Sequence, residues 1–200
     1  MTKTKFGRKL FHPLAIHLLV LVALFSGSLL QPTSLAATQS GRPTTVILVR
    51  HAEKKIVPPE NKDPDISAEG ETRAKEIARI FSSAGIDAIY ATQFKRTQQT
   101  VNPLAEQLRL TVTRIEAKKT SELVAQIRKA NIGQTVFVAG HNNTVPEIIA
   151  ALGGPQLPVI PETEFDNLYI LTIQKDGVVK LLQMKYGSHL PVSGQIMTKP

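Results

Sequence analysis

The stretch Thr45-Val46-Ile47-Leu48-Val49-Arg50-His51-Ala52 sets the interpretation of this 200-residue sequence. It begins with an unbroken run of β-branched and apolar residues, which is typical of a strand buried on both faces of a parallel sheet. Arg50 and His51 follow directly where that run ends. The pattern therefore predicts a buried strand that delivers an arginine and a histidine to one edge of a sheet.

Outward from this stretch, strand-like and helix-like patterns alternate along the chain. Helical spacing of apolar residues appears at 74–81, 101–108 and 123–127, and again from Thr144 to Leu152. Further strands are expected at 86–91, 110–115, 135–139, 168–173 and 178–184, the last two joined by a turn at Asp176-Gly177. The alternation predicts a three-layer α/β/α sandwich with a mostly parallel central sheet of about six strands and four helices.

Four local features carry expectations about the ends and shapes of the helices. Ser67 has the properties of a helix N-cap, and Gly85 is expected to end the same helix. Pro103 lies inside a helical pattern and predicts a kink or a split there. Thr144-Val145-Pro146-Glu147 has the spacing of a capping box at the start of the last helix.

Composition and charge exclude several classes of protein. The chain is 42% hydrophobic and 20% charged, which is typical of a globular fold. It has no cysteine, which excludes a disulfide framework, a thiolate nucleophile and a cysteine-ligated zinc site. The net charge is +8, but four of the 24 basic residues and no acidic residue precede Ala37, so the remainder carries +4. That mild excess suits an anionic substrate and lacks the dense basic patch of a nucleic-acid binder.

Residues 1–36 have the tripartite pattern of a secretory signal peptide. A basic start is followed by an apolar run at 14–25 and by small residues at 34–37. Cleavage after Ala36 or Ala37 would leave a mature domain at 37–200, either periplasmic or secreted, with no stable membrane insertion. The apolar run is short for a membrane span, which needs about 20 residues. An uncleaved N-terminal anchor is the alternative.

The residues best suited to catalysis or ligand binding follow the predicted strands. Arg50 and His51 come after the first strand, Arg96 shortly after the second, and His141 after the strand at 135–139. Ligands of open α/β sheets bind beyond the carboxyl ends of the strands, so these side chains are expected to meet. The segments 53–65 and 154–166 are expected to border the same pocket.

Two arginines and two histidines in this arrangement match the needs of a transferring phosphoryl group. Guanidinium groups bind its oxygens in a bidentate way, and a neutral imidazole can attack phosphorus. The helix that opens at Thr144 would add free N–H groups. No carboxylate cluster with the spacing of metal ligands is evident, so we expect no metal and no cofactor.

Three segments in order carry a resemblance to a known family. They are Val46-Ile47-Leu48-Val49-Arg50-His51-Ala52-Glu53, Tyr90-Ala91-Thr92-Gln93-Phe94-Lys95-Arg96-Thr97-Gln98-Gln99-Thr100 and Val136-Phe137-Val138-Ala139-Gly140-His141-Asn142, with Asp65-Ile66-Ser67-Ala68-Glu69-Gly70 fitting a linker between the first two. The chain resembles the histidine phosphatase superfamily, which has the phosphoglycerate mutase-like fold. The match runs from Val46 to Leu152.

This resemblance implies a catalytic role for each of four residues. His51 would accept the phosphoryl group, while Arg50, Arg96 and His141 would hold it. The implied reaction is hydrolysis of a small phosphomonoester through a phosphohistidine intermediate, without a metal. The family often supplies a carboxylic acid for the leaving group. Glu116, at the end of the third strand, and Glu53, beside the nucleophile, are the two candidates.

Three alternative functions stay open at this point. If neither glutamate acts as the acid, good leaving groups are favoured, and a phosphohistidine phosphatase becomes the alternative. A mutase that moves phosphate within a sugar acid would share the fold. A phosphate-binding protein without catalysis would share the pocket. The sequence predicts no oligomeric state.

Overall fold

A mixed six-stranded sheet lies at the centre of the domain, with strand order β3-β2-β4-β1-β5-β6. The strands are β1 (Thr44–Arg50), β2 (Ala88–Ala91), β3 (Val112–Arg114), β4 (Thr135–Gly140), β5 (Asn167–Ile173) and β6 (Val179–Lys185). The first four run parallel to one another, whereas β5 runs antiparallel to both β1 and β6. The predicted mostly parallel sheet with a final antiparallel hairpin is confirmed.

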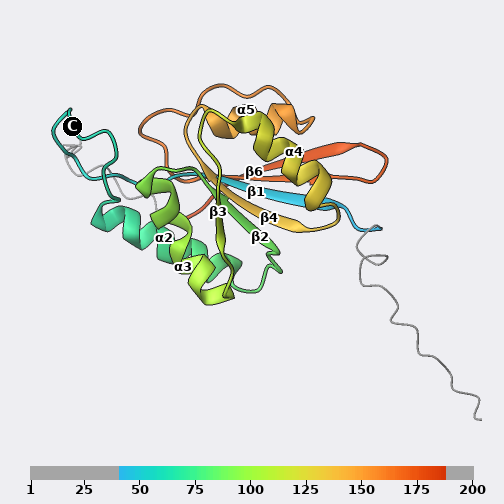
Figure 1. Cartoon of the computed structure of the whole chain (residues 1–200), viewed down its shortest axis with the longest axis horizontal. Coiled ribbons are helices and arrows are strands. Elements are labelled where there is room, and N and C mark those ends of the chain that lie inside the picture. The colour runs from blue at the N-terminus through green and yellow to red at the C-terminus, as the bar shows by residue number, and fades with distance from the viewer. Residues whose placement is uncertain (1–40, 188–200) are drawn as a thin grey trace, which may run out of the picture. The chain divides into compact units, whose positions relative to one another are not determined.

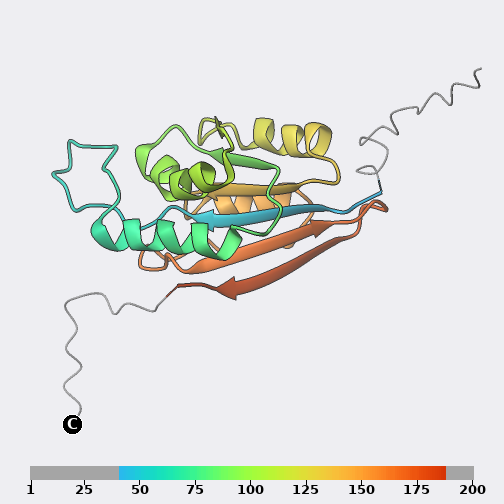
Figure 2. The ribbon, with the colours of Figure 1, turned by 90° about the horizontal axis from the view of Figure 1, so that it is seen from below.

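Helices cover both faces of this sheet (Figures 1 and 2). They are α2 (Ala68–Phe81), α3 (Lys95–Leu108), α4 (Thr120–Ala130) and α5 (Thr144–Ala151). Alternation along β1 explains the two layers. Val46 and Leu48 pack in the core beneath α4 and α5, and Ile47 and Val49 pack in the core beneath α2 and α3. The three-layer α/β/α sandwich is therefore the observed fold.

The computed structural model describes residues 41–187. The expected signal segment, with its cleavage point after Ala36 or Ala37, lies outside the described residues, and so does His189. Within the described part of the chain, no helix combines the length and the apolar character that crossing a membrane requires.

Two local expectations are confirmed, the Ser67 N-cap and the hairpin turn at Asp176-Gly177. The Ser67 hydroxyl accepts a hydrogen bond from the Gly70 N–H at 3.2 Å, as an N-cap does. At the hairpin, the Gln174 N–H donates to the Val178 carbonyl at 2.8 Å. Gly177 completes the turn with φ of 86°, a left-handed conformation that glycine adopts without steric cost.

Three other expectations differ from the structure in whole or in part. Helix α2 ends at Phe81 with Ser82 as its C-cap, so Gly85 lies beyond the end of the helix and does not terminate it. Helix α3 continues through Pro103 without a split, because Val101 and Leu104 on either side are fully buried and hold both halves on the sheet. The predicted capping box is wrong. Thr144 is the first residue of α5, and its hydroxyl accepts instead from the His141 N–H at 2.8 Å. The threonine thus fixes the loop before the helix.

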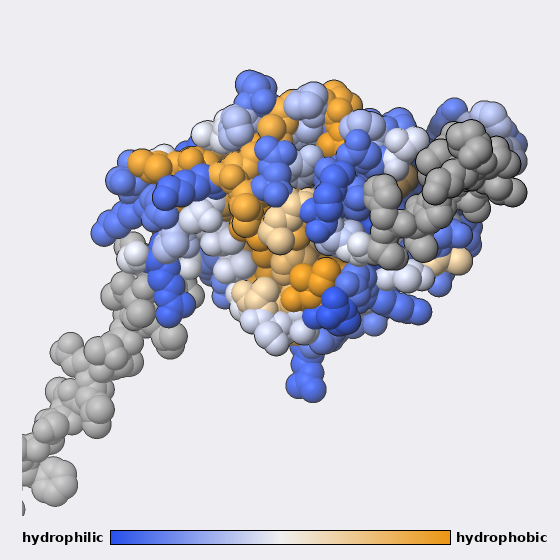
Figure 3. All heavy atoms as spheres, turned by 180° about the vertical axis from the view of Figure 1, so that it is seen from behind, coloured by the Kyte–Doolittle hydropathy of each residue, from blue (hydrophilic) through white to orange (hydrophobic). Residues whose placement is uncertain are grey.

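Apolar side chains are also visible on the surface. Figure 3 shows a band of them across the side of the domain that faces away in Figure 1. The exposed large apolar residues of the described chain include Val178, Leu182 and Met184 at the β5–β6 hairpin. Strand β6 lies at one end of the sheet order, so its outer edge has no strand partner among residues 41–187.

Gly70 allows the first turn of α2 to approach the loop after β1. A Cβ atom at this position would lie 2.3 Å from the Glu53 carbonyl oxygen, which already accepts from the Ser67 N–H at 2.8 Å. Alanine normally stabilises a helix by up to about 1 kcal/mol relative to glycine. Here the backbone clash outweighs that gain, because the carbonyl cannot move without breaking the junction.

We expect Gly70→Ala to lower the free energy of unfolding by about 2 kcal/mol. Urea denaturation checks this value. The matched control is Gly41→Ala, where no atom lies within 4 Å of the added methyl group, and a change within about 0.5 kcal/mol is expected. A Gly70→Ala protein as stable as the parent would show that the loop and the helix are not packed as described.

Candidate active site

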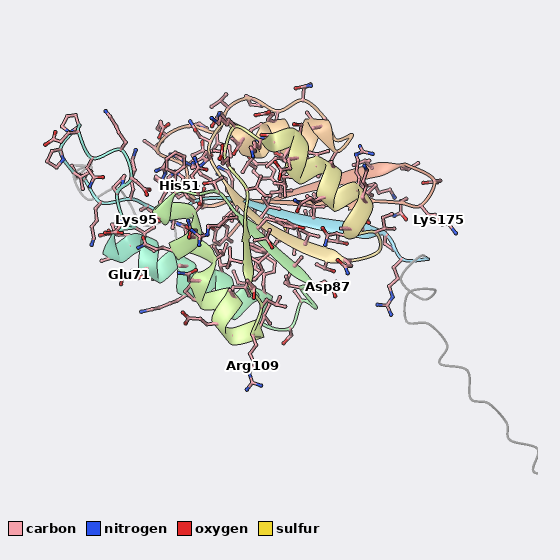
Figure 4. All side chains as sticks on the ribbon, viewed as in Figure 1. His51, Glu71, Asp87, Lys95, Arg109 and Lys175 are labelled. Carbon is pink, nitrogen blue, oxygen red and sulfur yellow. The ribbon has the colours of Figure 1, made fainter. Side chains whose placement is uncertain are left out.

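The carboxyl ends of β1, β2 and β4 meet at one edge of the sheet. Because β1 and β4 are parallel neighbours with Arg50 opposite Gly140, the next residues, His51 and His141, lie side by side. The His51 N–H donates to the Gly140 carbonyl at 2.9 Å, and the two imidazole centroids are 5.4 Å apart. Figure 4 shows His51 at this end of the sheet and Asp87 at the other.

A pocket of about 370 Å³ opens at this edge. Arg50, His51, Arg96 and His141 all line it. The structure thus brings the four predicted site residues together, although their catalytic roles stay predictions. Both segments that were expected to border the pocket contribute a residue, Lys54 from 53–65 and Glu162 from 154–166.

His51 is held in one tautomer by its neighbour. Its Nδ1 lies 2.8 Å from the Ala52 carbonyl oxygen, which can only accept, so Nδ1 carries the proton and Nε2 keeps a free electron pair. Burial lowers the pKa of His51 to about 3, and the charges of Arg50 and Arg96 act in the same direction. The imidazole is therefore neutral at physiological pH, which is the form that a nucleophile requires.

His141 is the second buried imidazole of the pocket. Its Nε2 lies 3.0 Å from the Thr92 hydroxyl, which in turn contacts the Thr97 hydroxyl at 2.8 Å. Burial lowers the pKa of His141 to about 4, and the charges of Arg96 and Arg50 add to this effect. Before phosphate enters, His141 is thus neutral as well.

These depressed pKa values predict how stability depends on pH. In the unfolded chain a histidine binds its proton below about pH 6.5, whereas folded His51 and His141 stay neutral to about pH 3 and 4. The unfolded state therefore binds more protons in this window, and stability falls as the pH drops from 6.5 toward 4. We expect a loss of about 1–2 kcal/mol per histidine between pH 7.5 and 5.

Urea denaturation of the parent chain and of His51→Ala at both pH values measures this effect. The variant lacks one of the two groups, so its stability should fall less over the same range. If the two proteins lost equal stability, His51 would not be buried in neutral form.

Arg50 is anchored on three sides. It is 1% exposed, and its Nη1 donates to the Pro161 and Glu164 carbonyl oxygens at 2.8 and 3.1 Å. Its Nη2 donates to Glu162 Oε2 at 2.6 Å, and the Phe165 ring stacks 4.3 Å from the guanidinium carbon. These contacts fix the plane of the guanidinium group.

Arg96 approaches the pocket from the first turn of α3. The Phe94 ring lies 4.4 Å from its guanidinium carbon, and Asp63 Oδ1 lies 3.8 Å from its Nη1. The Nε atoms of both Arg96 and Arg50 are buried and have no hydrogen-bond partner among residues 41–187. Because an unpaired buried donor is costly, two such donors in one pocket indicate a site for an anion.

The two candidate acids lie away from the pocket. Both carboxylate oxygens of Glu53 accept from Arg73, at 2.6–2.9 Å, so this side chain ties the loop to α2. Glu116 is exposed, with Lys118 at 3.8 Å. Neither glutamate lines the pocket. The carboxylate that does line it belongs to Glu162, which the sequence reasoning did not single out.

Other contributors were also missed at the level of sequence. Phe94 and Phe165 each stack on one of the arginines. The Thr100 hydroxyl accepts from the Ala52 N–H at 2.8 Å and so supports the nucleophile loop. Phe94 and Thr100 lie with Arg96 in the segment 90–100, so the resemblance of that segment could have indicated them. Phe165 lies in an irregular segment, where no sequence pattern indicates its role.

No group of three or more potential metal-ligating side chains is found in the described part of the chain. Metal independence stays a prediction, and it is tested below.

Comparison with known proteins places this geometry in context. The sequence profile described as histidine phosphatase superfamily (branch 1) matches residues 46–119. That range contains Arg50, His51 and Arg96, and it ends before His141. Phosphoserine phosphatase 1 from Hydrogenobacter thermophilus is 39% identical over 71 residues. The alignment covers 34% of this chain and 34% of that relative, so the chain spans about a third of its length.

Solved structures support the fold along more of the chain. A putative alpha-ribazole-5'-P phosphatase from Escherichia coli superposes with a TM-score of 0.59 at 13% identity, over 72% of this chain and 97% of that one. A phosphoserine phosphatase from Entamoeba histolytica gives 0.57 at 18%, over 74% and 100%. The protein histidine phosphatase SixA, complexed with tungstate, gives 0.56 at 17%, over 70% and 96%.

The profile match supplies the sequence evidence and the superpositions supply the fold. The pocket adds the paired arginines and histidines at the strand ends. Residues 46–119 are thus similar in sequence to the histidine phosphatase superfamily (branch 1), and the domain shares its fold with solved phosphatases.

Proposed function

We propose that this chain is an exported phosphatase that hydrolyses a small phosphomonoester through a phosphohistidine on His51, without a metal or cofactor. One observation carries the proposal. A neutral imidazole with a free Nε2 lies in a pocket where two buried arginine Nε–H donors have no partner within residues 41–187. A phosphate ester would satisfy both donors and would present its phosphorus to that imidazole.

The proposed reaction has two balanced steps. In the first, the electron pair of His51 Nε2 forms a bond to phosphorus while the bond to the ester oxygen breaks, and the leaving group takes a proton from solvent water to depart as the alcohol. In the second, water attacks phosphorus, the P–N bond breaks, and inorganic phosphate leaves. Arg50 and Arg96 stabilise the charge on the equatorial oxygens in both steps.

His141 and helix α5 would complete the binding of the phosphate. Burial keeps His141 neutral, and a bound phosphate dianion would raise its pKa by favouring the charged form. The N-terminus of α5, where Asn143 and Thr144 line the pocket, adds the positive end of a helix dipole. The pocket is thus suited to one phosphoryl group held from several sides.

The supply of a proton to the leaving group separates the main proposal from its principal alternative. Because neither Glu53 nor Glu116 lines the pocket and the Glu162 carboxylate is paired with Arg50, substrates whose leaving group needs little protonation are favoured. A phosphohistidine side chain is such a substrate, and this observation supports a phosphohistidine phosphatase as the second candidate. The SixA structure is described as a protein histidine phosphatase. Two other similar proteins carry the name phosphoserine phosphatase.

Hydrolysis of p-nitrophenyl phosphate in the presence of EDTA tests the proposal. We expect turnover that EDTA leaves unchanged and that vanadate inhibits. Activity that disappears with EDTA and returns with a divalent ion would overturn the metal-independent mechanism. An absence of turnover, with retained binding of phosphate, would favour the non-catalytic phosphate-binding protein. Interconversion of two phosphoglycerate isomers would favour the mutase.

Export is a separate part of the proposal, and it rests on residues 1–36 of the sequence. Mass spectrometry of the protein recovered from the envelope or the medium tests it. A mature chain that begins at Ala37 or Thr38 is expected, whereas an intact N-terminus in a membrane fraction would favour the uncleaved anchor.

A further inference from the structure

Glu162 is a carboxylate in a pocket that is otherwise lined by cations. Its Oε2 accepts from Arg50 Nη2 at 2.6 Å, and its Oε1 accepts from the Asn142 amide at 2.8 Å. The charged side chains around it in the pocket are Arg50, Arg96, Lys54 and Lys118. A negative charge beside a phosphate site weakens the binding of any phosphate, so its presence calls for a compensating role.

The backbone around Glu162 is fixed in place. The carbonyl oxygens of Pro161 and Glu164, on either side, both accept from Arg50 Nη1. The Ile160 N–H donates to the Asn142 carbonyl at 3.0 Å. Ligand entry can therefore rotate the Glu162 side chain, but the chain that carries it stays beside the pocket.

The donors of Arg50 show where the phosphate and the carboxylate meet. Nη1 is fully occupied by the two carbonyl oxygens, so an entering phosphate has access only to Nε and Nη2. Nε has no partner, and Nη2 holds Glu162. A phosphate that binds Nε thus lies next to the carboxylate, and one that takes Nη2 as well displaces it toward Asn142. In both cases Glu162 stays within a side chain's length of the ester.

The lysines at the pocket do not neutralise Glu162. Neither Lys54 nor Lys118 forms an ion pair with it, and Lys118 lies 3.8 Å from Glu116 instead. The Glu162 side chain is 70% exposed, so it faces the mouth where the leaving group of an ester would lie. A phosphate that takes Arg50 Nη2 deprives this carboxylate of its arginine partner, and the carboxylate then suits a cation on the substrate.

We propose that Glu162 is a specificity-determining residue that binds a positively charged amine on the leaving group. The inference rests on the proposed phosphatase function and narrows its substrates to phosphomonoesters that carry an ammonium group near the phosphate. Esters with further negative charge close to the phosphate are disfavoured by the same carboxylate.

The test compares two esters of similar size, O-phosphoethanolamine and n-propyl phosphate. They differ mainly in the ammonium group. The values of kcat/KM for both are measured with the parent chain, Glu162→Gln and the matched control Glu164→Gln. Glu164 lies in the same segment, but its carboxylate contacts Asn167 and Lys185 outside the pocket. Turnover of p-nitrophenyl phosphate is followed in parallel.

We expect the parent and the control to prefer the amine ester by roughly fivefold, as for a partly exposed ion pair. Glu162→Gln should lose this preference, and added salt should reduce it in the parent, because a charge interaction is screened. If the ratio of the two kcat/KM values were the same in all three proteins while p-nitrophenyl phosphate was turned over, the inference would be overturned. The phosphatase proposal would still stand.

Two further outcomes separate the inference from its rivals. If Glu162→Gln slowed both alkyl esters equally while it retained turnover of p-nitrophenyl phosphate, Glu162 would be a proton donor and not a binder of amines. If no ester, p-nitrophenyl phosphate included, were turned over by the parent, the proposed function would fail first.

Discussion

Replacement of His51 by alanine is expected to reduce turnover of p-nitrophenyl phosphate by on the order of 10⁴-fold. Without the imidazole there is no group to receive the phosphoryl, so only direct attack by water is left. Binding of phosphate or vanadate should survive, because the two arginines and His141 are untouched. Steady-state kinetics and vanadate inhibition together measure the effect.

The matched control for this prediction is His189→Ala, a histidine to which the mechanism gives no role. It should retain the activity of the parent. A His51→Ala protein that keeps a tenth or more of the parent activity would show that another group is the nucleophile, or that water attacks the ester directly.

Arg50→Ala is expected to affect activity and stability together. The change removes the Nε–H donor that would hold the phosphate, and we expect kcat/KM to fall by about 10³-fold. It also removes the Arg50 hydrogen bonds to the Pro161 and Glu164 carbonyl oxygens, of which the Pro161 oxygen keeps the Glu164 N–H, and it leaves the Phe165 ring without its stacking partner. The free energy of unfolding should fall by about 2–4 kcal/mol. Kinetics and urea denaturation measure the two effects.

Two variants separate the contributions of Arg50. Arg50→Lys keeps a charge but not the planar fork, so it should recover part of the binding and little of the rate. The control Arg79→Ala removes an arginine that is 72% exposed and pairs with Glu76 on the surface of α2, and it should change neither quantity appreciably. An Arg50→Ala protein of normal stability would contradict the anchoring of the segment 154–166.

The core of the site was predictable from the sequence because it rests on regular structure. The buried run at 45–49 predicts a strand, and parallel neighbours necessarily place the residues that follow them at one edge. His51 and His141 meet for that reason, through the pairing of Arg50 with Gly140. This pairing depends on the order of the strands in the sheet, which the sequence alone does not determine.

The contributions of irregular segments were not predictable in the same way. Glu162 and Phe165 lie between α5 and β5, where no periodic pattern fixes the backbone, and their positions depend on carbonyl contacts to Arg50. Thr144 satisfied the spacing of a capping box, but its hydroxyl bonds to the His141 N–H. The loop after β4 lies so close to Thr144 that its hydroxyl bonds to the loop and not to the helix.

The misplaced acid candidates have a similar explanation. Glu53 follows the nucleophile by two positions, which suggested a role in the pocket. The structure gives it a partner of opposite charge in Arg73, 9% exposed, and that pair joins the loop to α2. Whether a carboxylate faces a substrate or a neighbouring arginine depends on the tertiary fold, and the sequence spacing does not determine it.

In the proposed mechanism, phosphorus becomes bonded to His51 Nε2 during turnover. The most direct test is to mix the protein with ³²P-labelled substrate, to quench within milliseconds under alkaline conditions, and to map the labelled peptide. We expect a label that is stable in base and labile in acid, located on His51 and absent from His51→Ala. A label on another residue, or rapid release of phosphate without any labelled protein in the first turnover, would contradict it.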